Sequence, residues 1–576
     1  MLAQRRWLVL AVTLFACGDD GLSAGGGPGG GGGDGIGGAS SGAGGAGGES
    51  GCEACPLDLV CDEESATCSK EGTTTVIADD GTRLSTWVVL PERVPPEGVP
   101  ALLARTPYGS PYSAATEEFY RDMARVHAAR GYAYVLQDVR GRGKSEGEFI
   151  PETYEIVDGR TTTEWMVSQP WANGRIGTIG GSYLGYTALA AAIDNPLVSV
   201  VIADDTSNDE RTTRPGGTVW TYTLGWVHYL ENGTFPPDAA YTALPDTLDL
   251  MAADTALLGH DLPYWNGIVL HDDIGPWPEG SIDIAAAGGG ACVPALFVYS
   301  STTLWRDPLT AYRAFRDLGC SEMQEHQRLV LTHDPHTYHL SLLGFEDTPV
   351  TTLMFDTIDN YLKGDGEPLA AAPVMYNPPG DDAYVDATAY PGSSSIAYYL
   401  STGSLGTSPG PITSEAILSD PAVMSPCGGD YPYLELTTGP LAAELVIVGE
   451  PTLDLVATTD LGDFDVFASL YEYNPAFEGG VRFVQMGSQR ATYRAGDSPV
   501  ALPAAGEPIP IRVDFLPLAH RVEAGSELVL YLSTADCVAF ENPQSGELPS
   551  EQTTQLAGTV TFELGGESKL ELPVIP

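Results

Sequence analysis

Short apolar runs alternate with segments of helical spacing along the first part of the chain. The apolar runs predict strands at 101–104, 132–139, 176–179, 198–203, 295–299 and 328–331. Apolar positions three or four residues apart predict helices at 114–130, 155–168, 184–193, 309–318 and 351–363. Strands that alternate with helices are typical of a parallel sheet covered by helices. A hairpin at 73–90, which turns at Asp80-Gly81, precedes this alternation.

Two stretches depart from the alternation. Residues 206–288 are rich in Gly, Pro, Trp and Tyr and interrupt the sheet, which predicts an inserted cap. From residue 371 to 576, short β runs are separated by Gly, Pro and Asp turns, for example at 466–471, 528–532 and 558–564. This second pattern predicts an all-β jelly-roll sandwich. The expected fold class is therefore α/β, with an α/β domain at 71–370 followed by the all-β domain.

The first 51 residues have the composition of a targeting segment and a tether. A short basic stretch precedes an apolar run at 7–15, which is too short to span a bilayer. The run ends in Leu-Phe-Ala-Cys, which resembles a bacterial lipobox, so we expect a lipoprotein signal peptide at 1–17 with the lipid on Cys17. A plain cleaved signal is the alternative. Residues 18–51 are mostly Gly, Ser and Ala and predict a flexible tether. We therefore expect an exported, periplasmic or cell-surface lipoprotein that contacts the membrane only through this lipid.

The remaining eight cysteines are an even number, as an oxidising compartment favours. Four crowd into residues 52–70, where we expect a two-disulfide knot of undetermined pairing: Cys52, Cys55, Cys61 and Cys68. Zinc binding is the alternative, but the segment has no His. Two further pairs each join segments of one predicted domain, Cys292 with Cys320 and Cys427 with Cys537.

The charge balance bears on the partners of the protein. The chain has 77 Asp and Glu against 27 Lys and Arg, a net charge of −50. Phosphate binding needs a concentrated positive patch, so we expect no nucleic-acid partner. Such acidity keeps an exported protein dispersed, and adaptation to a salty habitat is the alternative. The oligomeric state does not follow from the sequence.

The strongest local signal for chemistry is a strand that runs through Gly180-Gly181 into Ser182 and then into an alanine-rich helix. This order is what a nucleophile elbow requires, because small neighbours permit the tight turn that exposes the serine hydroxyl. The helix directs its first backbone N–H groups toward a developing oxyanion. Gly-Gly-Ser is also an ordinary turn, but its place after a buried strand favours the elbow.

A nucleophilic serine needs a base and an acid that orients the base, each on a loop beyond a strand. Asp307 follows the strand at 295–299 and His336 follows the strand at 328–331, in the order expected for this fold. A helix N-cap is the alternative for Asp307. His333 and His339 share the loop and are the alternative bases. Metal binding by the three histidines is not favoured, because Pro335 interrupts a regular helix and no acidic ligand motif accompanies them.

A set of ordered motifs resembles the CocE/NonD family, which includes cocaine esterase and the X-Pro dipeptidyl-peptidases. The resemblance covers about residue 73 to the C-terminus. The motifs in the α/β domain are Arg105-Thr106-Pro107-Tyr108-Gly109, Asp138-Val139-Arg140-Gly141-Arg142-Gly143, Asp158-Gly159 and the serine elbow. Those in the β domain are Gly439-Pro440-Leu441, Asp463-Phe464-Asp465 and His520-Arg521-Val522.

The resemblance implies an α/β-hydrolase domain, a helical cap and a jelly roll, with Ser182 as nucleophile, His336 as base and Asp307 as its partner. It also implies an oxyanion hole made by the backbone N–H of Tyr183 and the phenolic hydroxyl of Tyr108, which can donate a hydrogen bond. Packing of Tyr108 on the sheet is the alternative for that residue. No cofactor or metal is implied. One departure is the loop before Asp307, which is longer than the Gly-Gly-Trp-x-Asp run of the family.

These features predict a serine hydrolase that cleaves carboxylic esters or amides of small acyl substrates. Leu309 and Thr310 stand where amino-acid ester hydrolases of the family have acidic residues, which counts against that activity. An X-Pro dipeptidyl-peptidase is the alternative, with Asp209 and Glu210 as candidate anchors for an α-amine. A non-catalytic carbohydrate-binding lipoprotein is a further alternative. Three cap aromatics could line the acyl pocket or pack in the cap core: Trp220, Tyr222 and Trp226.

Overall fold

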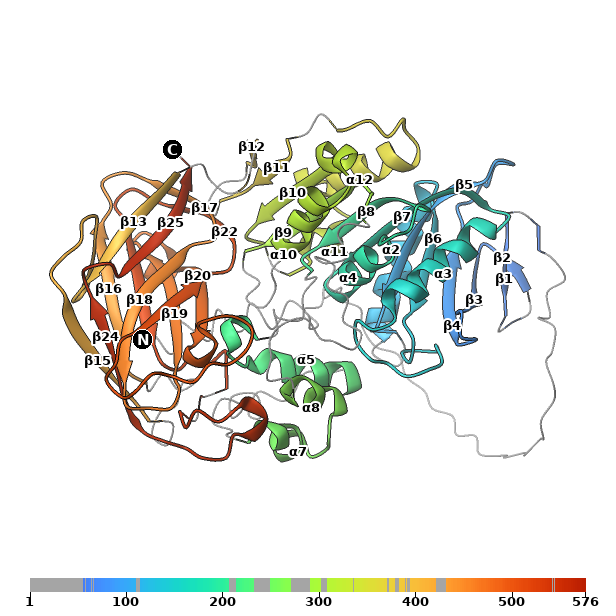
Figure 1. Cartoon of the computed structure of the whole chain (residues 1–576). Coiled ribbons are helices and arrows are strands. Elements are labelled where there is room, and N and C mark those ends of the chain that lie inside the picture. Colours follow the sequence, from blue (N-terminus) through green and yellow to red (C-terminus); the bar gives the residue numbers. More distant parts are fainter. Residues whose placement is uncertain are drawn as a thin grey trace, which may run out of the picture.

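The structure is a computed structural model in which two domains and a cap are described. It describes residues 55–575 except 57, 64, 66, 110–113, 207–213, 233–248, 271–290, 302–307, 335, 370–371, 379–382, 389, 391–393, 421–430, 541 and 543. Figure 1 shows the strand-and-helix domain at one end, the β-sandwich at the other, and the cap helices on one side between them.

A single sheet runs through the first domain. Within the described residues it has ten strands in the order β12-β11-β10-β9-β8-β7-β5-β6-β4-β3. The strands from β11 to β6 in this order are parallel, whereas β3, β4 and β12 pair antiparallel at the edges. The central strands are β5 (Val99–Thr106), β6 (Ala133–Asp138), β7 (Ala172–Gly181), β8 (Val198–Asp204), β9 (Ala295–Ser300) and β10 (Gln327–Thr332). They are the predicted apolar runs, and their burial on both faces explains why those runs are apolar almost throughout.

The hairpin and the helices also follow the predictions. The hairpin is β3 (Glu71–Ile77) with β4 (Arg83–Val89). Helices α2 (Ala114–Ala129) and α12 (Pro349–Leu362) bury Met123 and Met354 in the core on one face of the sheet. On the other face, α4 (Tyr183–Ala190) and α10 (Pro308–Arg313) share a second core with β8 and β9, and α3 (Glu155–Ser168) packs beside α4.

The predicted domain boundary at residue 370/371 is too early. Strands β11 (Val374–Tyr376) and β12 (Val385–Ala387) still belong to the first sheet, because β11 pairs parallel with β10. The second domain begins with β13 (Ser394–Ser401), whose partners are strands of the sandwich. A three-residue strand leaves no periodic pattern in a sequence, and this explains the difference.

The second domain is built from strands alone apart from short 3-10 turns in its described residues, as predicted. Its strand order begins with β15 (Thr413–Ser419) and β24 (Gly558–Leu564). It ends with β16 (Tyr433–Pro440), β23 (Glu527–Ser533), β19 (Asp465–Tyr473) and β20 (Val481–Arg490). Inward-facing residues such as Phe464, Leu530 and Phe562 are fully buried in one large core. The sandwich therefore has a hydrophobic core separate from those of the sheet domain.

The cap is helical where it is described. Helices α5 (Thr221–Asn232), α7 (Ala253–Leu258) and α8 (Pro263–Leu270) pack around their own core. The cap also joins the sandwich: the Thr221 N–H donates to the Val538 carbonyl at 2.9 Å, and the Phe540 ring lies 5.5 Å from the Trp265 ring. No helix in the described part of the chain is long and apolar enough to cross a bilayer.

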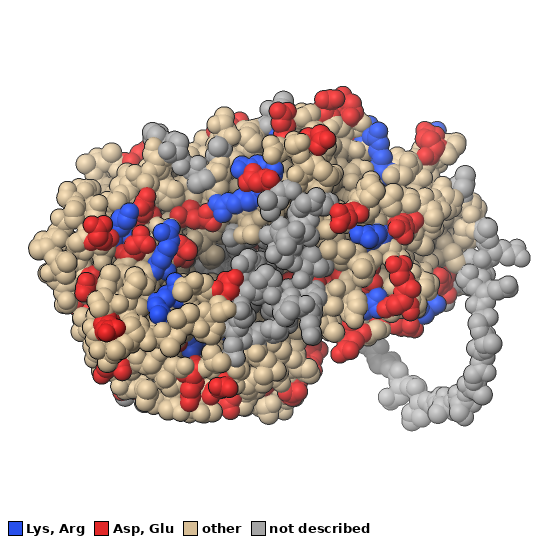
Figure 2. Space-filling view, in the orientation of Figure 1, with Lys and Arg blue, Asp and Glu red and all other residues tan. Residues whose placement is uncertain are grey.

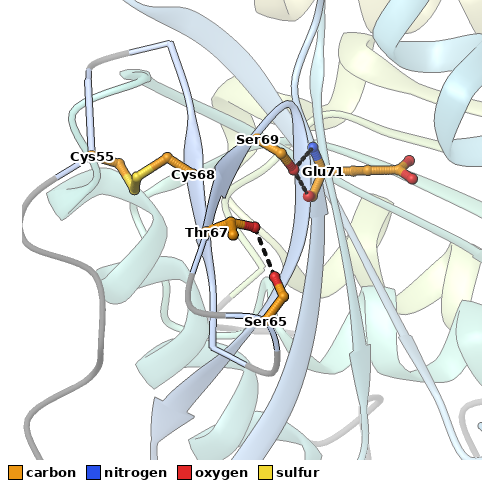
Figure 3. The surroundings of a disulfide bond; sticks show 6 residues. All are labelled: Cys55, Ser65, Thr67, Cys68, Ser69 and Glu71. Carbon is orange, nitrogen blue, oxygen red and sulfur yellow. Dashed lines mark hydrogen bonds between the residues drawn. A yellow bond between two sulfur atoms is a disulfide. The ribbon is translucent and has the colours of Figure 1, made fainter.

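Disulfides are present in the Cys-rich segment before the sheet domain and within the sheet domain itself. Cys55 is bonded to Cys68 beside the small hairpin of β1 (Val60–Asp62) and β2 (Thr67–Ser69), as Figure 3 shows. The predicted Cys292–Cys320 bond is confirmed. Cys61 and Cys537 are also disulfide-bonded. The signal peptide, Cys17, the tether, Cys52 and Cys427 lie outside the described residues, so the predictions for them stay predictions.

Candidate active site

Ser182 lies at the junction of β7 and α4 in an unusual backbone conformation. Its φ is 55° and its ψ is −131°, a combination that costs a residue with a Cβ on the order of 1–3 kcal/mol. The position is the N-cap of α4, yet the side chain makes no capping hydrogen bond to the helix. Serine at an N-cap normally uses its hydroxyl in this way. The turn therefore keeps the hydroxyl out of the helix and has the strained backbone expected of the predicted nucleophile elbow.

The glycines before Ser182 are required by close packing. A Cβ on Gly180 would overlap the backbone of Leu184 in the following helix. A Cβ on Gly181 would stand 2.8 Å from Cγ2 of Thr337, the residue after His336. Small residues at these positions thus serve two purposes, the tight turn itself and the close approach of the histidine loop.

His336 lies in the loop that follows β10 and is buried, with 5% of its surface exposed. Its Nδ1 is hydrogen-bonded to Oδ2 of Asp205. The two other histidines of the loop have different partners: Nδ1 of His333 lies 3.2 Å from the Asn377 carbonyl, and Nε2 of His339 lies 3.0 Å from Oδ2 of Asp334. Of the three, His336 is the one whose carboxylate partner comes from the strand next to the nucleophile.

Asp205 is the residue of this site that the sequence analysis missed. It directly follows β8, is fully buried and has a φ of 48°. The signal was present, because an Asp pair at the end of a buried strand is an uncommon ending for an apolar run. The predicted acid, Asp307, lies outside the described residues, so its position relative to His336 stays a prediction.

Asp204, beside Asp205, ties the elbow to the histidine loop. Its carbonyl accepts the Ser182 N–H at 3.0 Å, and its Oδ2 accepts the Leu340 N–H at 2.8 Å. Burial, together with the negative charge of Asp205, raises the pKa of Asp204 to about 7. A neighbouring buried carboxylate disfavours ionisation of Asp204, and a carboxyl group with a pKa raised in this way is typical of functional sites.

The two residues predicted to supply oxyanion donors, Tyr108 and Tyr183, both contact Trp226. Tyr108 follows β5, which pairs with β7, and its hydroxyl accepts a hydrogen bond from Nε1 of Trp226 at 3.2 Å. The Trp226 ring also stacks on the Tyr183 ring, with 6.1 Å between centroids and 30° between planes. The Tyr183 hydroxyl points away, since it donates to Oε1 of Glu155 at 2.6 Å. Tyr183 can therefore serve this site only through its backbone N–H, the first of α4.

The other two cap aromatics differ in their surroundings. Trp220 is buried against sandwich residues, with Phe467 and Met486 in the same cluster. Tyr222 is half-buried between that cluster and the cap core. Of the three candidate pocket walls, Trp226 contacts both predicted oxyanion residues.

Residues of the family-like motifs in the α/β domain hold the loop that carries Tyr108. A Cβ on Gly109 or Gly143 would overlap the Asp138 carboxylate, which packs between these two loops. Arg140 donates from Nη2 to Oδ1 of Asp158 at 2.7 Å, a buried ion pair that fixes the loop against α3. These residues therefore hold the loop that carries Tyr108 in place.

The surface agrees with the acidic composition. Figure 2 shows acidic side chains spread over the visible face of the molecule, with fewer basic ones among them. Among the described residues, no group of three or more His, Cys, Asp or Glu side chains could hold a metal ion.

Comparison with known proteins agrees with this geometry. The model of the X-Pro dipeptidyl-peptidase (S15 family) matches residues 80–338, and that of the X-Pro dipeptidyl-peptidase C-terminal non-catalytic domain matches residues 384–571. Cocaine esterase from Rhodococcus sp. (strain MB1 Bresler) is 26% identical over 574 residues, which cover 86% of this chain and 97% of the esterase. The second match begins at residue 384, directly before β12 and close to the observed start of the sandwich.

Solved structures show the same fold. An aminopeptidase from a marine-sediment Thaumarchaeota archaeon has a TM-score of 0.74 at 19% identity, covering 91% of this chain and 98% of that one. A CocE/NonD family hydrolase from Staphylococcus aureus has a TM-score of 0.66 at 17% identity, covering 88% and 94%.

Fold and site together define a serine hydrolase with an α/β-hydrolase domain and a C-terminal all-β domain. The chain belongs to the CocE/NonD family. The family and the class of enzyme predicted from the sequence are confirmed, and the alternative of a non-catalytic surface protein is set aside.

Proposed function

We propose that this hydrolase cleaves carboxylic esters of small acyl groups through an acyl-enzyme intermediate on Ser182. The observation that carries the proposal is the strained elbow of Ser182, packed at Gly181 against the loop of the carboxylate-bound His336. The match to cocaine esterase, which spans nearly the whole of that protein, supports an ester as substrate.

The proposed reaction follows from the chemistry of these groups. Ser182 attacks the acyl carbonyl while His336 takes its proton, and the oxyanion is bound by the Tyr183 N–H and the Tyr108 hydroxyl. The alcohol leaves with a proton from His336, and water then attacks the acyl-enzyme in the same way. The hydroxyl of Tyr108 accepts from Nε1 of Trp226, and a phenolic hydroxyl is a donor as well as an acceptor.

The nucleophile is tested by substitution and by labelling. Ser182→Ala is expected to abolish hydrolysis of p-nitrophenyl acetate while the far-UV circular dichroism spectrum stays unchanged. A fluorophosphonate probe should label the wild type but not this variant, because the probe reacts with an activated serine. Ser168→Ala, at an exposed serine on α3, is the matched control and should keep full activity and labelling. Labelling of Ser182→Ala would contradict the assignment.

A second candidate is an X-Pro dipeptidyl-peptidase, which the descriptions of both matching domain models favour. It needs an acidic anchor for the free α-amine of the peptide, and the predicted candidates Asp209 and Glu210 lie outside the described residues. A screen that pairs short-chain aryl esters with Xaa-Pro aryl amides separates the two activities. A higher kcat/KM on the amides would assign the chain to the peptidases.

For localisation, we propose an exported lipoprotein anchored through Cys17. The support is the basic and apolar N-terminus, the Leu-Phe-Ala-Cys run and the Gly-rich tether. The disulfides at Cys55–Cys68 and Cys292–Cys320 fit an oxidising compartment outside the cytosol. Cys17→Ser should release the protein from the membrane fraction of the producing cell, whereas unchanged fractionation would contradict the anchor.

A further inference from the structure

Gln485 is a fully buried side chain of the sandwich that reaches the part of the sheet domain next to His336. Its Nε2 donates to the Ser301 carbonyl, just beyond the end of β9, at 3.0 Å. We propose that Gln485 is a positioning residue of this hydrolase, through which the β-sandwich holds the surroundings of the catalytic base in place. The inference rests on the proposed function, because it concerns the base that activates Ser182. The family model that matches the sandwich is that of a non-catalytic domain, and a share in positioning the base goes beyond that description.

The Ser300-Ser301 segment contacts the carboxylate that is bonded to the imidazole. The Ser300 N–H donates to Oδ1 of Asp205 at 3.3 Å, while Oδ2 of Asp205 is hydrogen-bonded to Nδ1 of His336. Asp205 and His336 are both buried. A shift of the segment would therefore move a donor away from this carboxylate and change how the carboxylate meets the imidazole.

The same segment also contacts the loop that carries His336. The Ser300 hydroxyl donates to the Asp334 carbonyl, and the Ser301 N–H donates to the Thr332 carbonyl at 2.7 Å. Thr332 is the last residue of β10, and Asp334 lies two residues before His336. Ser301 is thus hydrogen-bonded both to the histidine strand and to the sandwich, through its N–H and its carbonyl.

Both ends of the Gln485 amide have partners, and these define its orientation. Nε2 donates to the carbonyls of Ser301 and Pro517, at 3.0 and 3.2 Å, and Oε1 accepts the Met486 N–H at 2.9 Å. Turning the amide over would direct its oxygen at carbonyl oxygens, which cannot donate a hydrogen bond. Nε2 is therefore the atom that faces Ser301.

The contact lies within a packed junction of the two domains. The Tyr299 hydroxyl, from β9, donates at 3.2 Å to the same Pro517 carbonyl that Gln485 contacts. Val448 and Ala519 of the sandwich are buried in the cluster that also holds Tyr299. A hydrogen bond among buried apolar side chains is electrostatically stronger than one in water, so this contact resists displacement of the segment.

Ser301 is also the last described residue before 302–307, the loop in which the sequence predicts the acid Asp307. A fixed Ser301 gives this loop a fixed origin, so Gln485 has a positioning role whichever carboxylate acts on the base. Catalysis depends on such placement, because a displacement of about 1 Å that arises far from the reacting atoms can cost about 10²-fold in rate. Loss of the Gln485 amide should therefore slow the chemical step and leave substrate binding little changed.

The test compares Gln485→Met with Gln489→Met in the full chain. Methionine has nearly the length of glutamine but no N–H to donate. Gln489 is the matched control, because it lies on the same strand and its Nε2 donates to the Gly216 carbonyl of the cap, also at 3.0 Å. We expect Gln485→Met to lower kcat on p-nitrophenyl acetate about 10- to 100-fold with KM changed less than about threefold. Gln489→Met should keep kcat within about twofold of the wild type. Equal losses of kcat in the two variants, or a loss below about twofold in Gln485→Met, would overturn the proposal.

A second rate separates positioning from loss of folded protein. The rate constant for reaction with a fluorophosphonate, measured on the sites that the probe finally labels, should fall in Gln485→Met by about the same factor as kcat, because both reactions use the activated serine. A merely structural role would lower the guanidinium unfolding midpoint without slowing either reaction of the labelled sites, and that result would also overturn the proposal. If Gln485→Met does not fold, Gln485→Asn, whose amide is one methylene shorter, decides by the same two rates. Failure of the proposed function is distinguishable, because the wild type would then neither hydrolyse the ester nor react with the fluorophosphonate.

Discussion

At the scale of single residues, Tyr108 is the group whose role depends most on one contact. Its hydroxyl accepts from Nε1 of Trp226, and this bond fixes the position of the hydroxyl oxygen. Removing the hydroxyl removes an oxyanion donor, so Tyr108→Phe should lower kcat about 10²- to 10³-fold. The measurement is steady-state kinetics on a short-chain aryl ester. A loss below about threefold would remove Tyr108 from the oxyanion hole.

Trp226→Phe isolates the orienting bond. The variant keeps an aromatic ring beside Tyr183 but loses the indole N–H, so we expect a smaller loss of kcat, about tenfold, than in Tyr108→Phe. The double variant should be no slower than Tyr108→Phe alone, because both substitutions act through one hydroxyl. Additive losses would show that Trp226 acts independently. Trp220→Phe is the matched control, since Trp220 lies against the sandwich.

At the scale of elements, the approach of the β7–α4 turn to the histidine loop is the most demanding contact. A Cβ at Gly181 would stand 2.8 Å from Cγ2 of Thr337 and 3.1 Å from Cδ2 of Leu340. Gly181→Ala should therefore displace the loop and lower kcat about 10- to 100-fold, since a shift of about 1 Å can cost that much. Gly406→Ala, whose Cβ would have its nearest neighbour at 3.7 Å, is the control. Equal activities in the two variants would contradict the role of this contact.

The central strands and the elbow could be predicted because their physical signals are local. Strands β5 to β10 are buried on both faces and so read as apolar runs, and Gly180-Gly181-Ser182 reads as a constrained turn. Strands β11 and β12 have three residues each and leave no periodic pattern, so the sequence predicts a domain boundary that precedes them. The contact of His336 with Asp205 could not be singled out for a different reason: parallel strands end at one edge, and spacing along the chain does not say which strand supplies a carboxylate to the imidazole.

At the scale of the whole molecule, both domains bury a carboxyl group with a raised pKa. Burial raises the pKa of Asp204 in the sheet domain and of Asp465 in the sandwich to about 7 in each case. A carboxyl whose pKa is higher in the folded than in the unfolded chain binds more protons when folded. Its contribution to stability is complete below its unfolded value, near 3.8, and is lost as the pH rises through about 7.

Stability should therefore fall as the pH rises from about 4 to 7, and less so when Asp465 cannot titrate. We expect Asp465→Asn to reduce the fall in the guanidinium unfolding midpoint between pH 5 and pH 7.5. The net charge of −50 acts in the same direction in wild type and variant, so it does not produce the difference. Asp122→Asn, on a half-exposed side chain of α2, is the control and should follow the wild type. Parallel curves for Asp465→Asn and the wild type would contradict the assignment.

The indole of Trp226 comes from the inserted segment, whereas the phenol that it orients comes from the sheet domain. Under the proposed mechanism, the same inserted helix takes part in rate enhancement as well as enclosing the substrate. Variable segments on a rigid scaffold are where enzymes usually acquire new specificities. Here a replacement at position 226 would alter turnover together with recognition, so evolution of the substrate range is restricted to parts of the insert that do not touch this ring.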